Sequence, residues 1–256
     1  MSNISEFRWV SAARTDVGLV REINEDACLD RPEHRLWAVA DGMGGHAVGD
    51  VASRMLIDSL ESWHVPETLD ERMREGHERL LAVNAQLRAE AARRLVRRIG
   101  STVVVLVAGL RSCGYLWAGD SRVYLYRQGV LRQLTRDHSQ VEDLKARGQL
   151  TAEEALHHPA RHLITRAVGA MDTLEIDEDR IDLHDGDRFL LCSDGLSNEL
   201  SDLEMASEVA ADDCRQAADR LVDRALSRGG RDNISVIVAH AEDLACSDKT
   251  QINPTL

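Results

Sequence analysis

The sequence of 256 residues predicts an α+β fold built on antiparallel sheets. Short apolar runs are separated by turn residues, as in strands joined by hairpins. Helical stretches lie between groups of strands and do not alternate with single strands as in parallel sheets. A chain of this length is most simply one domain. We expect residues 1–241 to form it, with a polar, flexible tail over residues 242–256.

The N-terminal part is predicted to contain two strands and two long helices. The segment SEFRWVSAARTDVG is strand-like, and after a polar stretch a second strand covers residues 36–40 and leads into Asp-Gly-Met-Gly-Gly. An apolar stripe with helical spacing follows, and Pro66 ends it; the stripe consists of Ala52, Leu56, Leu60 and Trp63. A longer helix is predicted over residues 69–98, with Gly100 just past its end.

The chain becomes rich in strands after residue 100. Four short runs indicate an antiparallel meander: TVVVLVAGL, CGYLWAGD, RVYLYRQG and VLRQL. Residues 137–165 are polar and helix-leaning, and we interpret them as an inserted flap. Strands are expected again around residues 181 and 188–192, then a helix over 213–227 and a last strand over 234–240.

Composition excludes several classes of protein. The formal net charge of −13 disfavours binding to nucleic acid, because such affinity comes mainly from Lys and Arg neutralising phosphates. A basic run at Arg93, Arg94, Arg97 and Arg98 lies in the predicted helix and is interpreted as a solvated face. Five widely spaced cysteines without a CxxC pair argue against a disulfide framework or a zinc ribbon.

No stretch of the sequence predicts membrane insertion. The longest apolar run, residues 103–110, is much shorter than the roughly 20 residues that span a bilayer. The N-terminus MSNISEFRW lacks the basic and then apolar layout of a signal peptide. We therefore expect a cytoplasmic protein.

Four aspartates lie where an apolar run meets a polar turn: Asp41, Asp120, Asp194 and Asp232. The first three follow predicted strands and the fourth precedes one, so antiparallel pairing would bring all four to one edge. A single Asp-Gly pair would indicate only a hairpin turn. Four carboxylates at one edge require a counter-ion, and oxygen ligands without cysteine pairs favour Mg²⁺ or Mn²⁺. Two such ions form a site for displacement at phosphorus.

Two further residues complete this predicted site. Glycines after Asp41 would let the chain turn so that the Gly42 carbonyl faces a metal ion. Arg21 is the candidate for binding a phosphate, because a guanidinium holds two phosphate oxygens in a fork. The alternative is that Arg21 is a surface charge; its position beside Glu25 and Asp26 favours the site.

The chain resembles the metal-dependent serine/threonine protein phosphatases of the protein phosphatase 2C type, in their compact bacterial form. The resemblance covers nearly the whole chain and rests on ordered motifs: VREINEDA (20–27), VADGMGGHAVGD (39–50), GSTVVVL (100–106), AGDSRVYLY (118–126), LTRDHS (134–139), LITRAVG (163–169), LLCSDGLSNELSD (190–202) and GGRDNISVIV (229–238). It implies two antiparallel sheets with helices on both outer faces and a flap that influences substrate access.

The resemblance also implies a role for each site residue. Asp41 would bridge two metal ions, Asp194 and Asp232 would complete the first, and the Gly42 carbonyl would bind the second. Glu25 and Asp26 would surround the second ion through water, and Asp120 with Asp194 would hold a third. Arg21 matches the phosphate-binding arginine. The reaction would be hydrolysis of phosphoserine or phosphothreonine on proteins, opposing a Ser/Thr kinase.

One departure from the family concerns the proton donor. Animal members carry a histidine directly after the Asp-Gly, where this chain has Met43. His46 could protonate the leaving group only if the loop curls back, and a structural role is the alternative. Two rival functions also remain: a phospho-dependent binding module of the same fold, and a phosphatase for small molecules. An acidic surface argues against a nuclease.

Overall fold

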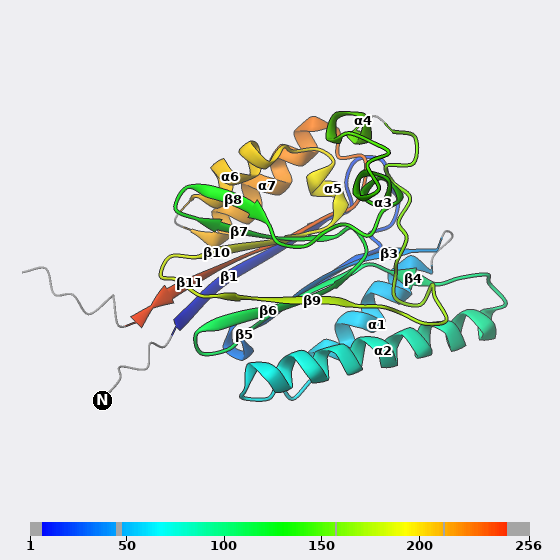
Figure 1. Cartoon of the computed structure of the whole chain (residues 1–256), viewed down its shortest axis with the longest axis horizontal. Coiled ribbons are helices and arrows are strands. Elements are labelled where there is room, and N and C mark those ends of the chain that lie inside the picture. The colour runs from blue at the N-terminus through cyan, green and yellow to red at the C-terminus, as the bar shows by residue number, and fades with distance from the viewer. Residues whose placement is uncertain (1–6, 45–47, 157, 212, 245–256) are drawn as a thin grey trace, which may run out of the picture.

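Two antiparallel sheets lie face to face between helices in the computed structural model, which describes residues 7–44, 48–156, 158–211 and 213–244 (Figure 1). The upper sheet in the figure has the strand order β1-β11-β10-β7-β8, and the lower sheet has the order β2-β3-β5-β6-β9 with β4 paired to β3. Every pair of neighbouring strands is antiparallel. The predicted α-β-β-α sandwich is confirmed.

The strand bounds follow the predicted apolar runs closely. The first sheet comprises β1 (Phe7–Asp16), β11 (Ile234–Asp243), β10 (Arg188–Cys192), β7 (Arg122–Arg127) and β8 (Val130–Gln133). The second sheet comprises β2 (Asp26–Arg31), β3 (Leu36–Met43), β4 (Gly100–Ser101), β5 (Val103–Ala108), β6 (Ser112–Ala118) and β9 (Asp177–Asp182).

Helices cover the outer face of each sheet. The second sheet packs against α1 (Gly49–Glu61) and α2 (Leu69–Arg94), and the first against α5 (Asp194–Ser197), α6 (Asp202–Val209) and α7 (Cys214–Arg228). Two short helices, α3 (Gln140–Ala146) and α4 (Ala152–Leu156), lie in the predicted flap, and the 3₁₀ turn η1 (Pro32–His34) joins β2 to β3. Within the described ranges, none of the helices combines the length and the apolar character that crossing a bilayer requires.

Strand β5 shows why continuous apolar runs suit this architecture. All six of its residues are buried. Val103, Val105 and Val107 pack with the helices below, and Val104, Leu106 and Ala108 face the other sheet. Because side chains alternate between the two faces of a strand, a strand in the middle of four layers needs an apolar residue at every position.

The structure corrects several sequence predictions. The polar stretch after the first strand contains β2, an edge strand with only two buried residues and therefore no apolar periodicity. The four predicted meander strands divide between the two sheets, and α5 and α6 were not predicted. Helix α2 ends at Arg94, four residues early, because Leu95 adopts a left-handed conformation with φ of 57°. The last strand continues to Asp243.

Candidate functional site

Four predicted site aspartates lie at one end of the sandwich. Asp41 lies in β3, two residues before its end. Asp120 and Asp194 each lie two residues beyond the ends of β6 and β10, and Asp232 lies two residues before β11. Burial raises the pKa of Asp41 well above its usual value, and the charges of four other carboxylates raise it further; these belong to Asp26, Asp194, Asp120 and Asp232. The structure therefore brings the aspartates into one electrostatic cluster.

Asp26 faces Asp41 across the β2–β3 pair, where the two residues are directly opposed. Its Oδ2 atom accepts a hydrogen bond of 2.8 Å from the hydroxyl of Ser193, the residue that follows β10 of the other sheet. Burial raises the pKa of Asp26 to about 7, although the hydroxyls of Ser193 and Ser235 oppose the shift. Ser193 thus connects the two sheets at the site, a role that sequence reasoning missed.

Asp120 and Asp194 form the second part of the cluster. Burial, followed by the charges of Asp194 and Asp137, raises the pKa of Asp120 to about 8. Burial and then the charge of Asp232 raise the pKa of Asp194, whose Oδ2 atom accepts a hydrogen bond of 3.0 Å from Asn198.

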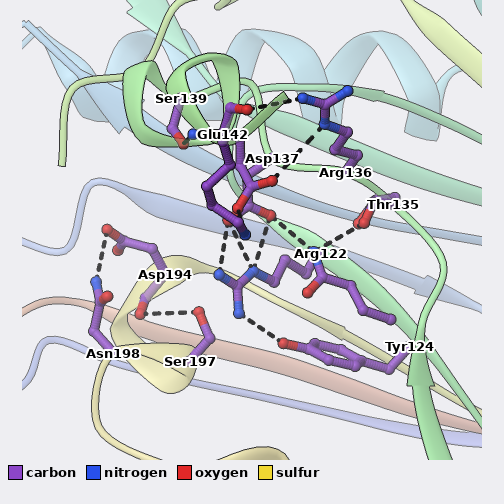
Figure 2. Close-up of polar contacts among 12 residues, drawn as sticks. Arg122, Tyr124, Thr135, Arg136, Asp137, Ser139, Glu142, Asp194, Ser197 and Asn198 are labelled. Carbon is purple, nitrogen blue, oxygen red and sulfur yellow. Dashed lines mark hydrogen bonds and ion pairs between the residues drawn. The ribbon is translucent and has the colours of Figure 1, made fainter. Parts of the chain in front are cut away.

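Arg122 provides positive charge beside these two aspartates. Figure 2 shows its guanidinium in a fork on Asp137, with Nη2 to Oδ2 at 2.7 Å, and Asp194 nearby at the start of α5. The charge of Arg122 lowers the pKa of both Asp120 and Asp194, but burial is the larger effect. The positive charge of Arg122 therefore neutralises the negative charge of the cluster only in part.

Arg21 lies at the open side of the site and is bound to it. Its Nη2 atom donates to Asp232 Oδ2 at 2.8 Å, and its side chain is 54% exposed. The hydrogen bond and charge of Asp232 raise the pKa of Arg21. The guanidinium is thus both within reach of the carboxylates and open to solvent, which suits a group that binds a phosphate.

The Asp-Gly turn is packed too closely for any larger residue. A Cβ atom on Gly42 would lie 2.0 Å from the Gly49 carbonyl oxygen and 2.6 Å from that of Glu25. The Gly42 amide donates to the Glu25 carbonyl at 3.0 Å. The Glu25 carboxylate accepts from the Gly49 amide at the start of α1, at 3.1 Å. Glu25 therefore joins the turn to the helix.

Asn233 holds the loop that carries Arg21. Its side-chain amide donates to the carbonyls of Val17 and Ile23 at 2.9 and 3.0 Å, and its Oδ1 accepts from the Glu25 amide at 2.8 Å. Asn233 therefore organises the loop through three hydrogen bonds to its backbone.

The chemistry of the cluster fits divalent cations. Among the residues that the structure describes, three buried carboxylate oxygens have no hydrogen-bond partner: Oδ1 of Asp26, of Asp50 and of Asp194. Buried oxygens without donors are costly unless a cation neutralises them. Within the described ranges, no three side chains of the types His, Cys, Asp and Glu are placed to hold an ion between them alone. Mg²⁺ suits such a site, because it commonly retains several water ligands.

Not every predicted residue can be placed. His46 lies outside the described residues, so its predicted role is unaltered. Asp50, in the first turn of α1, is an additional carboxylate that the sequence argument did not select. Its only signal was its position at the end of the motif that begins with Val39.

Comparison with known proteins identifies the family. The sequence profile described as Protein phosphatase 2C matches residues 20–229, which is more than half of the chain. This chain belongs to the protein phosphatase 2C family. It is 39% identical over 255 residues to the serine/threonine protein phosphatase PstP of Mycobacterium tuberculosis, an alignment that covers 96% of this chain and 47% of PstP. The chain thus spans about half the length of that relative.

Solved structures of protein phosphatase 2C relatives share this fold. PppA, described as a key regulatory component of T6SS in Pseudomonas aeruginosa, is 41% identical with a TM-score of 0.87, covering 93% of this chain and 99% of PppA. The catalytic domain of PstP in complex with two manganese ions is 35% identical with a TM-score of 0.80, covering 93% of this chain and 100% of that domain.

Proposed function

We propose that this protein phosphatase 2C family member hydrolyses phosphoserine and phosphothreonine on proteins with the help of two bound Mn²⁺ or Mg²⁺ ions. The observation that carries the proposal is a cluster of buried aspartates that includes carboxylate oxygens without a hydrogen-bond partner. The cluster lies beside the solvent-exposed side chain of Arg21. Similarity to the PstP catalytic domain, whose structure contains two manganese ions, supports it.

Each carboxylate has a proposed place in metal binding. Asp41 would bridge the two ions, with Asp194 and Asp232 on the first ion. The Gly42 carbonyl would bind the second, with Glu25 and Asp26 around it through water. Asp120 would join Asp194 in holding a third ion. When bound, divalent ions supply Lewis acidity and neutralise charge in a displacement at phosphorus.

Arg21 would bind and orient the phosphoryl group. In the structure its guanidinium neutralises Asp232, and the same fork can bind two phosphate oxygens when that carboxylate is otherwise neutralised. A phosphate bound there would be held beside the aspartate cluster, and its ester oxygen would need a proton as the alcohol leaves. His46 is proposed as a proton donor to that oxygen, since Met43 has no proton to give.

The natural substrate would be a phosphorylated protein in the cytoplasm, in a pathway with a Ser/Thr kinase. The net charge of −13 argues against nucleic acid as a substrate. A phosphatase for small molecules would use the same site, so substrates must separate the two functions.

The experiment measures phosphate release from phosphothreonine peptides, nucleotides and sugar phosphates with Mn²⁺ or Mg²⁺, before and after chelation. We expect release from peptides that EDTA abolishes and added metal restores. Asp232→Ala should reduce it at least about 100-fold, as expected for removal of a metal ligand. As a control, Asp223→Asn replaces a surface aspartate, 66% exposed, and should leave activity unchanged. Full activity in excess EDTA would refute the proposal.

Metal binding can be measured without turnover. Mn²⁺ should raise the melting temperature of the parent protein, because a ligand that binds only the folded state stabilises it. Asp41→Asn should lose most of this increase, and Asp223→Asn should keep it. An equal increase in all three proteins would place the ion elsewhere.

A further inference from the structure

A basic turn borders the candidate active site. The turn, residues 93–98, comprises Arg93, Arg94, Leu95, Val96, Arg97 and Arg98. The sequence indicated a solvated helical face, but α2 ends at Arg94 and the last four residues lie beyond it. Figure 1 shows α2 ending at the side of the molecule where β3 meets β4.

Short contacts connect this turn to the loop that carries Asp41. The chain runs from the turn directly into β4, where Gly100 pairs with Met43. A Cβ atom built on Gly44 would lie 3.6 Å from the carbonyl oxygen of Arg98. The Ser101 hydroxyl donates to the Asp41 carbonyl at 2.9 Å. The turn is therefore held beside the site by the backbone pairing that also fixes Asp41.

Two arginines of the basic turn form no ion pair with any carboxylate in the part of the chain that the structure describes. Arg93 and Arg94 both bind Glu90. Arg97 and Arg98 are exposed, and no carboxylate in the described ranges forms an ion pair with either. This is unusual for a chain of net charge −13, in which acidic groups outnumber basic ones. The pair is thus a local positive surface on an acidic protein, next to the place where a phosphopeptide would bind.

We propose that the basic turn binds acidic side chains of the phosphoprotein substrate, through Arg97 and Arg98. This inference rests on the proposed function and names the substrate class: phosphopeptides with Asp or Glu at a fixed distance from the phosphorylated residue. Complementary charge of this kind contributes mainly to partner choice and encounter.

The strand register sets that distance. Asp41 lies two residues from Met43, and Arg98 lies two residues from the Gly100 that pairs with it. Strand dimensions then give a backbone separation of roughly 10 to 14 Å between Asp41 and Arg98. An extended peptide rises about 3.3 Å per residue, so the preferred acidic residues lie about three to five positions from the phosphorylated one.

The test uses phosphothreonine peptides that carry two glutamates at three to five positions from the phosphothreonine, on either side, or glutamines at the same positions. The parent protein with Mn²⁺ should have a KM about three- to tenfold lower for the matching glutamate peptide, given the modest strength of exposed ion pairs. The double variant Arg97→Ala/Arg98→Ala should lose this preference at unchanged kcat. The charge reversal Arg97→Glu/Arg98→Glu should favour peptides with lysine there.

A matched control removes the same charge from another place. Arg111 and Arg132 are exposed and likewise form no ion pair in the described ranges; Arg111 lies in the β5–β6 turn, at the opposite end of those strands. Arg111→Ala/Arg132→Ala should keep the peptide preference. The KM for p-nitrophenyl phosphate, which has no flanking residues, should be the same in all variants. Raising the salt concentration should weaken only the preference for acidic peptides.

Failure of this inference differs from failure of the proposed function. Equal KM values for glutamate and glutamine peptides, or a preference that survives the Arg97 and Arg98 substitutions, would overturn the basic turn as a binding surface and leave the phosphatase intact. Absence of turnover with every peptide would overturn the proposed function. In that case, fluorescence anisotropy of the labelled peptides still measures binding directly, and equal affinity of parent and double variant would overturn the inference.

Discussion

Without metal, the protein should lose stability as the pH rises from about 5.5 to about 8. Folding raises the pKa of Asp26 from 3.8 to about 7, so the folded state holds a proton that the unfolded chain has released. Stability from such a group is complete below the unfolded pKa and is lost as pH rises through the folded value.

The shift of Asp26 sets the size of the effect. If this carboxyl titrated alone, the free energy of unfolding would fall by about 4 kcal/mol at high pH. About 2 kcal/mol of that fall would occur between pH 5.5 and 8. For a chain of this size, the melting temperature should fall by about 4 to 8 °C. Burial lowers the pKa of His138, which acts in the opposite direction, so the measurement needs a reference without Asp26.

The assay is thermal unfolding in EDTA at several pH values, for the parent and for Asp26→Asn. The variant should be the more stable protein at pH 8 and should lose the part of the downward slope that comes from Asp26. The raised pKa values of Asp41, Asp120 and Asp194 keep a downward slope in both proteins, and His138 acts in both. Saturating Mn²⁺ should make the melting temperature of the parent less dependent on pH, because a bound cation stabilises the ionised carboxylates. The quantity to compare is the difference in melting temperature between the metal-free parent and Asp26→Asn. The same difference at pH 5.5 and at pH 8 would refute the electrostatic argument.

Three further predictions concern single positions. Arg21→Ala should reduce kcat/KM for phosphopeptides about 10- to 100-fold through loss of a charged hydrogen-bonding group. Arg21→Lys should recover only part of the lost kcat/KM. Equal activity in both variants and the parent would show that Arg21 is not part of the site. Gly42→Ala should destabilise the protein by at least about 1 to 3 kcal/mol, because the new methyl group would overlap backbone atoms. Gly76→Ala in α2 should not destabilise it, because the atom nearest to the new methyl group is 3.4 Å away. Chemical denaturation of both variants and the parent measures the difference. Leu95→Gly should stabilise by about 0.5 to 1 kcal/mol, since Leu95 is 94% exposed and holds a left-handed conformation; a lower midpoint of denaturation would contradict this.

The sequence predicted the sheets and the position of the aspartates because both depend on local patterns. The apolar run of β5 needs burial on both faces, and only a central strand offers that. Asp41 and Asp120 follow such runs, and the antiparallel pairing of β3 and β6 with β5 brings them to one edge of the second sheet. Asp194 and Asp232 reach an edge of the first sheet through the β10–β11 pair, and the packing of the two sheets brings both pairs together. These conclusions required no knowledge of side-chain contacts.

Features that depend on long-range contacts were beyond the sequence. The hydrogen bond between Ser193 and Asp26 joins residues from different sheets, and no spacing indicates it. The end of α2 is another example, because leucine at position 95 would continue a helix by its own preference. The chain must leave the helix there so that Gly100 can pair with Met43, and this moves Arg97 and Arg98 from a helical face to the edge of the site.

The pairing of β2 with β3 shows why a cation belongs to this site on grounds of stability as well as of activity. Asp26 and Asp41 are directly opposed in an antiparallel pair, where two like charges destabilise the sheet. A sequence selected for stability alone would carry a neutral residue at one of the two positions. Ser193 satisfies only one oxygen of Asp26, and the other is buried without a donor. The opposed carboxylates are therefore stable together at neutral pH only with a proton or a cation between them, and only a cation leaves both able to act as ligands.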